Sequence, residues 1–333
     1  MSKSSLKNTS KKTHNLVSII IPVFNQEKYV FDAINSALNQ DYLNIEVVVV
    51  DDGSTDRSFK IIKDSFEKKI NLIHQKNLGP SAAINKGIKN SKGDFICLLG
   101  GDDLCSPDRV SSQLEKILKD KADIVFCRPH IINEHGKKQD DTVFANFSNS
   151  YTTGTLAANP VENSKFFNEL FLHGNTLCAP TAFFKREIVS LLGEFDESLI
   201  HLQDYDYWLK ALSNDLTFTF HNQRLVFYRR HSNNLSSKEN FSKGLNEYIY
   251  ILDRVLDLGK PSILRNCFSE FIFPEINKNK PISLFEKSLI FLCHPNEFIR
   301  RRGYEIFLGS SKDKSFSYAR KNGFDQFKFL LNL

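Results

Sequence analysis

Short apolar runs alternate with amphipathic segments through the first 130 residues of the chain. Almost every position in the runs is apolar and many are β-branched, which is typical of strands buried on both faces. They span 17–22, 45–50, 95–99 and 124–127, with a shorter strand expected at 71–74. Helical spacing of apolar positions lies between them, at 26–39, 56–66, 80–90 and 107–118. The alternation predicts an α/β fold, Rossmann-like, with a mostly parallel central sheet between helices.

The second half of the chain has a less regular pattern. Residues 140–165 are rich in Asn, Ser and Thr and are expected to form a loop, whereas 166–172 and 183–192 have helical character. A connection at 194–202 leads to a helix that opens at residue 203, and a short strand is expected at 225–229. Beyond residue 237 the pattern is helical and rich in Phe and Leu. We therefore expect a disordered basic tail at 1–15, a main domain at 16–237 and a helical C-terminal extension at 238–333.

Composition adds a class and a charge distribution to this outline. The chain has 333 residues, of which 41% are hydrophobic and 25% charged, as in an ordinary soluble globular protein. The net charge of +5 is concentrated at the ends, because residues 1–15 hold four lysines and no acid. From residue 282 onward, nine Lys and Arg face five acids. Such an end suits an anionic membrane surface, and a solvated tail with a basic helix face explains it equally well. No nucleic-acid partner is expected.

Cysteine spacing and hydropathy bear on location. The six cysteines show no CxxC spacing, so neither a zinc ribbon nor a redox dithiol is indicated. Residues 1–15 lack the apolar segment of a secretory signal, and no uncharged apolar run is long enough to span a membrane. We expect reduced thiols and a cytoplasmic protein, with peripheral attachment at the inner face of the cell membrane as a further possibility.

Polar side chains follow three of the predicted strands at the points where they end. These strand ends are 22–25 (PVFN), 51–54 (DDGS) and 100–103 (GGDD). In parallel sheets, ligands bind beyond the carboxyl ends of the strands, so these groups should meet at one edge.

Each of the three groups has a functional interpretation and a structural one. Asp102 and Asp103 are suited as oxygen ligands for Mg²⁺ or Mn²⁺, and an exposed acidic turn is the alternative. Asp52 is suited to accept hydrogen bonds from a nucleotide base or ribose, whereas Ser54 or Thr55 could simply cap a helix. Phe24 is either an aromatic wall of that site or part of the core.

Taken together, six segments resemble the inverting family 2 glycosyltransferases. Each motif alone is weak, and the resemblance rests on their order and spacing from residue 17 to residue 231. The segments are 17–25 (VSIIIPVFN), 50–56 (VDDGSTD), 77–87 (NLGPSAAINKG), 95–103 (FICLLGGDD), 203–209 (QDYDYWL) and 228–231 (YRRH).

The resemblance implies a nucleotide-binding fold of the glycosyltransferase A type, with residues 16–237 as the catalytic domain. It implies a nucleotide-diphosphate sugar donor, in particular a UDP-sugar, a Mn²⁺ or Mg²⁺ ion, and transfer with inversion to a hydroxyl of a glycan or lipid-linked acceptor. By position, Asp204 is the general base and Asp103 a direct metal contact. The remaining implied site residues are Asp52 at the uracil or ribose, Asp102 near the ribose and metal, and Pro22 and Phe24 along the donor.

Several positions qualify this interpretation. Arg229, Arg230 or His231 would stabilise the departing diphosphate, and His231 is either a metal ligand or a structural histidine. The family often has an acid at position 100 and another at 203, where this chain has Gly100 and Gln203. It also has Ile84 where an arginine is frequent. Asp206 is a reserve candidate for the base that more plausibly pairs locally, and Trp208 belongs to the core or to an acceptor-site wall.

Alternative functions differ in what they require of the sequence. A processive polymerase would carry a Gln-x-x-Arg-Trp motif after Trp208, and none is present. A nucleotidyltransferase or a nicotinamide-dependent oxidoreductase would carry a glycine-rich loop after the first strand, where 22–27 (PVFNQE) has no glycine. A non-catalytic sugar-nucleotide-binding protein remains as the alternative to an enzyme.

Overall fold

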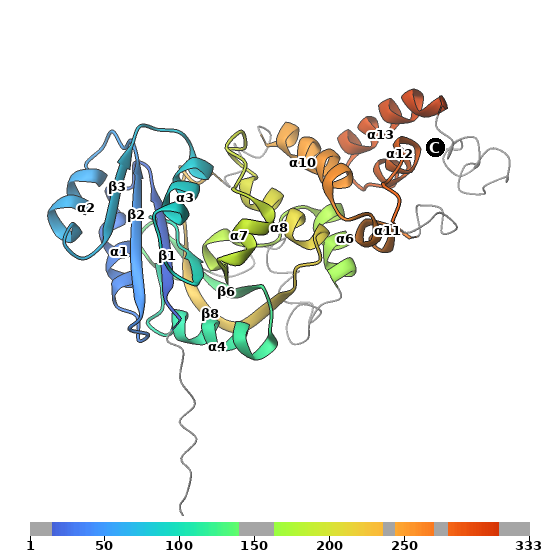
Figure 1. Ribbon diagram of the computed structural model, residues 1–333. Coiled ribbons are helices and arrows are strands. Elements are labelled where there is room, and N and C mark those ends of the chain that lie inside the picture. The colour runs from blue at the N-terminus through green and yellow to red at the C-terminus, as the bar shows by residue number, and fades with distance from the viewer. Residues whose placement is uncertain (1–14, 140–162, 236–243, 270–278, 313–333) are drawn as a thin grey trace, which may run out of the picture.

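An eight-stranded sheet runs through the computed structural model, which describes residues 15–139, 163–235, 244–269 and 279–312. The strand order is β3-β2-β1-β4-β7-β6-β8-β5 (Figure 1). The strands are β1 (Val17–Val23), β2 (Ile45–Asp52), β3 (Asn71–Gln75), β4 (Phe95–Leu98), β5 (Leu104–Cys105), β6 (Ile124–Asn133), β7 (Phe183–Lys185) and β8 (Phe218–Arg230).

Six of these strands run in one direction. β3, β2, β1 and β4 pair in parallel. β7 is antiparallel to both β4 and β6, so β4 and β6 share a direction, and β8 is parallel to β6. Only β7 and the short β5 run the other way in the described sheet. The mostly parallel sheet expected from the apolar runs is thereby confirmed.

The alternation of side chains along each strand separates two cores, one on each face of the sheet. Ile20 faces α3 (Pro80–Lys89), where Gly87 lets the helix lie close to the strand; a Cβ at Gly87 would stand 2.5 Å from Cγ2 of Ile20. Its neighbours Ile19 and Ile21 face the other core. That core is completed by α1 (Val30–Leu38), α2 (Ser58–Phe66) and α4 (Arg109–Asp120).

The core around Ile20 continues into the C-terminal half of the chain. It extends through buried side chains of successive helices as far as Ile306. The helices beyond residue 237 therefore share a core with the sheet, and Figure 1 shows them lying beyond α6 and α8 from the strands. Whether residue 237 is a domain boundary stays a prediction. The helices of this half are α6 (Asn163–His173), α7 (Glu187–Leu192), α8 (Gln203–Ser213), α10 (Leu245–Leu258), α11 (Pro261–Cys267), α12 (Leu284–Leu292) and α13 (Glu297–Gly309).

Two elements differ from their predicted form. Residues 183–185 form strand β7 and not the start of a helix, because they complete the pairing between β4 and β6. β8 begins at Phe218, seven residues before the predicted strand, and pairs along the whole of β6. The expected tail at 1–15 and loop at 140–165 lie almost entirely outside the described residues.

Two further expectations concern the cysteines and membrane spans. All six cysteines are free thiols. In the part of the chain that the structure describes, no helix has the length and apolar character needed to cross a bilayer.

Candidate active site

The loops after β1 and β2 are joined by hydrogen bonds at the edge of the sheet. Asn25 adopts a left-handed backbone conformation (φ 53°), and its side-chain oxygen accepts a hydrogen bond from the Thr55 backbone N–H at 2.8 Å. The backbone N–H of Asn25 in turn donates to Ser54 Oγ at 3.0 Å. α2 begins at Ser58, whose backbone N–H donates to Asp56 Oδ1 at 2.8 Å and not to Ser54 or Thr55. Ser54 and Thr55 therefore stabilise the junction of two strand ends, and the N-cap interpretation is wrong.

Asp52 fixes the loop that leads from β3 to α3. Its carboxylate is 4% exposed and accepts three hydrogen bonds, from Gln75 Nε2 at 2.8 Å and from the backbone N–H groups of Leu78 and Gly79 at 2.9 Å each. Both oxygens are thus engaged within the protein. The role of Asp52 at a base or ribose stays a prediction.

The neighbouring Asp51 has an acceptor atom left over. Its Oδ2 lies 2.8 Å from His74 Nδ1, on a histidine whose side chain is 50% exposed. Its Oδ1 is buried and has no hydrogen-bond partner among the described residues. A buried acceptor without a donor is costly, which makes Asp51 a candidate for ligand recognition. Sequence reasoning passed over Asp51, although it belongs to the same acidic pair as Asp52.

Pro22 and Phe24 lie at the same edge of the sheet. Pro22 is partly buried within β1, opposite Val50 of β2. Phe24, just after the strand, is 44% exposed. The ring of Phe24 is therefore not a core side chain, and it offers an aromatic face beside the strand ends.

Asp102 is brought together with His231 from the end of β8. His231 Nε2 lies 2.9 Å from Asp102 Oδ2, and Asn234 Nδ2 lies 3.3 Å from the same oxygen. The side chains of Asp102 and His231 are 13% and 10% exposed. The histidine ring is stacked on Tyr29 with centroids 5.1 Å apart. A carboxylate oxygen and an imidazole nitrogen thus share one partly open position.

Asp103 points into the protein. It is 1% exposed, and its Oδ1 accepts a hydrogen bond from the Arg229 backbone N–H at 2.8 Å. Burial, together with the adjacent Asp102, raises the pKa of this carboxyl well above its usual range. A Cβ at position 100 would stand 2.6 Å from Asp103 Oδ2 and 2.8 Å from Asp102 Oδ1. Glycine at position 100 therefore leaves room for both carboxylates as they are arranged.

The guanidinium of Arg229 holds backbone around the acidic pair. It donates from Nε to the Asp102 carbonyl at 2.7 Å and from Nη1 to the carbonyls of Asn133 and Glu134 at 3.3 and 3.2 Å. It also lies over the Tyr29 ring, 4.7 Å from its centroid. Arg229 is only 4% exposed, whereas its neighbour Arg230 is partly exposed.

Asp204 is the second residue of α8, and its carboxyl is partly buried. Burial raises its pKa from 3.8 to about 6, although a hydrogen bond from Asn175 lowers it. Asn175 Nδ2 donates to Asp204 Oδ2 at 2.8 Å. A carboxyl with this pKa is suited to accept a proton near neutral pH. Asn175 lies in an irregular segment that gave no sequence signal.

Cys178 relates Asp204 to the acidic end of β4. Burial raises the pKa of the Cys178 thiol well above its usual range, and the nearby negative charges of Asp103 and Asp204 raise it further. Both carboxylates therefore lie within electrostatic range of one buried thiol. The segment around Cys178 also connects the two by hydrogen bonds, because Asn175 binds Asp204 and the Ala182 carbonyl accepts from the Leu98 backbone N–H at 3.1 Å.

Two other residues of α8 have structural roles. Asp206 binds Arg254 Nη2 through both carboxylate oxygens at 2.7 Å each, so it pairs locally. Trp208 is fully buried, with its ring edge-on to Phe126.

Gln203 is partly buried, and its side-chain oxygen has no hydrogen-bond partner among the described residues.

Comparison with known proteins identifies the class to which this fold and site belong. The model of glycosyl transferase family 2 matches residues 18–192, and the chain belongs to this family. It is 38% identical over 201 residues to an uncharacterized glycosyltransferase of Rickettsia typhi, covering 59% of this chain and 58% of that one. An uncharacterized glycosyltransferase of Haemophilus influenzae is 34% identical over 204 residues, covering 59% of this chain and 72% of the relative. The chain thus spans little more than half the length of the Rickettsia relative.

A synthase and a solved structure extend the comparison. The chondroitin synthase of Escherichia coli is 30% identical over 255 residues, which cover 74% of this chain and 34% of the synthase. The crystal structure of S. aureus TarS 1–349 in complex with UDP-GlcNAc superposes with a TM-score of 0.60 over 92% of both chains, at 17% identity. This superposition shows a shared fold, the glycosyltransferase A type that the sequence predicted.

Proposed function

We propose that the protein is an inverting glycosyltransferase that moves a sugar from a UDP-sugar donor to a hydroxyl of a glycan or lipid-linked acceptor. The observation that supports the proposal is that residues 175–182 connect Asp204, whose pKa is about 6, to β4, which ends just before the Asp102–His231 pair. The Asp102–His231 pair is suited to a metal-bound diphosphate, and Asp204 is suited to accept a proton. A single displacement at the anomeric carbon needs both.

The nucleotide would lie along the ends of β1 and β2. The exposed face of Phe24 and the neighbouring Pro22 offer a wall for the base, and Asp51, whose buried Oδ1 has no partner among the described residues, lies at the end of β2 beside them. In this proposal Asp52 acts at the base or ribose side by holding the loop at 75–79 in place. The complex of the structural neighbour with UDP-GlcNAc supports a uridine donor.

A divalent Mn²⁺ or Mg²⁺ ion fits the donor set at Asp102 and His231. A carboxylate oxygen and an imidazole nitrogen are both ligands of Mn²⁺. Here the two atoms lie 2.9 Å apart, on residues that follow β4 and β8. Asp103 is the second acid of this proposed site, and it supports the end of β8 by accepting a hydrogen bond from the Arg229 backbone N–H. In the described part of the chain no three His, Cys, Asp or Glu side chains form a complete ligand group, so diphosphate and water would complete the shell. When bound, the ion neutralises charge on the leaving diphosphate.

The chain's own residues carry the remaining steps. Asp204 accepts the proton of the acceptor hydroxyl. At the same time the oxygen of that hydroxyl forms a bond to the anomeric carbon, and the bond from this carbon to the diphosphate breaks. Asn175 holds the Asp204 carboxylate from one side. The partly exposed Arg230 contributes positive charge beside the leaving group, while Arg229 fixes the backbone at Asp102.

A donor screen tests this function. Purified protein is incubated with a panel of nucleotide-diphosphate sugars and mixed glycan acceptors, with Mn²⁺ or with EDTA, and release of nucleoside diphosphate is measured. We expect release from a UDP-sugar that EDTA abolishes. Binding of the donor without release from any member of the panel would instead identify a non-catalytic sugar-nucleotide-binding protein.

The basic, Phe-rich end of the chain is the proposed contact with an anionic membrane surface. In α13, Arg301 is exposed between the exposed apolar side chains of Phe298 and Leu308, and Glu305 shares this surface. Other residues of this proposal, Phe327, Lys328 and Phe329, lie outside the described residues. Binding to anionic but not neutral liposomes, weakened by Arg301→Glu at its exposed position, is the expected result. Equal binding by this variant would refute this proposal.

A further inference from the structure

The carboxylate of Glu247, in the first turn of α10, binds three consecutive backbone N–H groups just before α8. Ile200 N donates to Glu247 Oε1 at 3.0 Å, and His201 N and Leu202 N donate to Oε2 at 2.9 Å each. The donors belong to the segment that ends at the start of α8, and the second residue of that helix is Asp204. One side chain from the C-terminal helices therefore holds the backbone leading into the proposed base.

The part of this segment that precedes residue 200 is held from the other side, by α3. Asn85 exchanges two hydrogen bonds with the backbone of Phe195, both at 2.9 Å, and Ser81 Oγ donates to the Leu199 carbonyl at 3.2 Å. α3 thus fixes residues 195–199, and Glu247 supplies the acceptor for the next three amides. The path of the chain into Asp204 depends on both helices.

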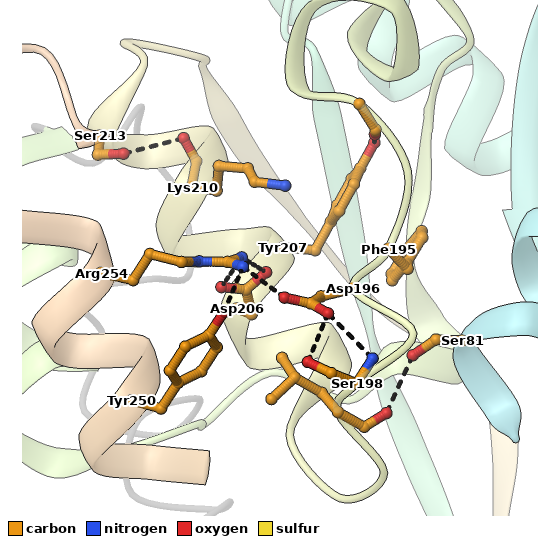
Figure 2. A network of polar contacts seen from close by, with 12 residues as sticks. Ser81, Phe195, Asp196, Ser198, Asp206, Tyr207, Lys210, Ser213, Tyr250 and Arg254 are labelled. Carbon is orange, nitrogen blue, oxygen red and sulfur yellow. Dashed lines mark hydrogen bonds and ion pairs between the residues drawn. The ribbon is translucent and has the colours of Figure 1, made fainter. Parts of the chain in front are cut away.

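Arg254 is a second anchor on the same face of α10. It lies seven residues after Glu247, two helical turns further along. Its guanidinium binds both oxygens of Asp206 and also pairs with Asp196, as Figure 2 shows. Asp206 and Asp196 lie in the first turn of α8 and in the segment before it. α10 therefore holds α8 and the residues that precede it at two points.

We propose that Glu247 is a positioning residue for the transfer reaction, which orients Asp204 through the backbone of residues 200–202. The proposal rests on the proposed role of Asp204 as base. The Asp204 carboxylate is held by Asn175 and by backbone N–H groups at the start of α8, so its orientation depends on where that helix begins. The C-terminal helices contribute to catalysis through this contact without touching the substrate.

Charge and length explain why the position requires a glutamate. An ionised carboxylate is acceptor-only and can serve three N–H donors at once. A glutamine would turn its NH₂ group toward one or two of these donors, and an aspartate would fall short by one methylene. Glu247→Gln should therefore release part of the segment while keeping nearly the same volume.

Two readouts on the same variants test the proposal. We expect Glu247→Gln to lower kcat by about 100-fold, the scale of a small misplacement of a catalytic group, with donor affinity by calorimetry changed less than about twofold. Amide hydrogen exchange at residues 200–202 should become faster. Glu247→Asp should lie between wild type and Glu247→Gln in both readouts, which keeps the test informative if Glu247→Gln folds poorly. Glu115→Gln, at an exposed position of α4, is the matched control and should change neither.

The outcomes separate this proposal from the proposed function. Faster exchange with unchanged kcat would overturn the positioning role and leave Glu247 as a structural contact. Unchanged exchange in Glu247→Gln would overturn the anchor itself, whatever the kinetics. Absence of nucleoside-diphosphate release by the wild-type chain would overturn the proposed function, and the exchange measurement would still decide whether the anchor exists.

Discussion

His231 Nε2 lies 2.9 Å from Asp102 Oδ2, although 129 positions separate the two residues in the chain. The contact joins the end of β8 to the end of β4. Arg229 reinforces it, because its guanidinium donates a hydrogen bond to the Asp102 carbonyl and stacks over the Tyr29 ring. The residue after the last strand thus meets the acidic pair that follows β4.

Removing either side chain of this pair should weaken metal-dependent donor binding. Even a residue that only orients a metal ligand contributes roughly 10- to 100-fold to metal affinity, so His231→Ala and Asp102→Ala should weaken binding of UDP by at least about that factor in Mn²⁺. Calorimetric titration with Mn²⁺ and with EDTA measures this. If the variants bound UDP in Mn²⁺ as tightly as wild type, neither residue would be a metal ligand.

Asp103→Ala should give the same loss by another route. It removes the buried carboxylate that binds the Arg229 backbone, so the end of β8 should no longer hold His231 in place. The same titration in Mn²⁺ checks this, and an unchanged affinity for UDP would refute a role for Asp103 at the site.

Gly100→Ala should disturb the acidic pair directly. The added methyl would stand 2.6 Å from Asp103 Oδ2, closer than van der Waals contact allows, so a carboxylate must rotate. We expect metal-dependent UDP affinity to fall about tenfold, with the rest of the fold retained. Gly309→Ala is the matched control, because a Cβ there has no neighbour within 4 Å among the described residues. Equal affinities for the two variants would contradict the close packing at Gly100.

Transfer should lose activity on the acid side of neutrality. Burial raises the pKa of Asp204 to about 6, and only its ionised form accepts a proton, so kcat should fall about tenfold per pH unit below that value. The hydrogen bond from Asn175 lowers this pKa, so Asn175→Ala should move the acid limb to higher pH. A profile of kcat against pH, at saturating donor, checks both. An acid limb near pH 4 in the wild-type enzyme would contradict the assignment.

The raised pKa also predicts that Asp204→Asn stabilises the protein in alkaline solution. Below pH 3.8 Asp204 is protonated whether the chain is folded or unfolded; as the pH rises to about 6 the folded state becomes progressively less stable, because it disfavours the charge. Above pH 6 the cost is at most about 3 kcal/mol, which the neutral amide avoids. Tm should therefore rise by several degrees at pH 8 and hardly at all at pH 4. An equal Tm at pH 8 would show that Asp204 is well solvated.

Much of the sheet could be predicted because its central strands are buried on both faces. The apolar runs at 17–22 and 45–50 end within two residues of the ends of β1 and β2. β7 could not be found in this way, because its three residues are a strand only through pairing with β4 and β6. The first half of β8 was missed because partly exposed His221 and exposed Asn222 and Gln223 interrupt its apolar pattern.

The site was predictable where its residues belong to motifs. The acidic pair Asp102-Asp103 and His231 were named from the sequence, and the structure brings Asp102 and His231 into contact. Asn175 and Glu247 carry no local pattern, because their roles come only from long-range contacts with Asp204 and with residues 200–202. Asp102 and Asp103 look alike in the sequence, and only the structure shows that Asp102 is partly open whereas Asp103 is buried.

The most direct test of the proposed function compares Asp204→Asn with wild type in transfer and in donor binding. Nucleoside-diphosphate release is measured with Mn²⁺, donor and acceptor, and donor affinity is measured by calorimetry on the same preparations. The variant should lose nearly all transfer while binding the donor with an affinity close to that of wild type, because only the proton acceptor is removed. Full transfer by Asp204→Asn would contradict the proposed mechanism.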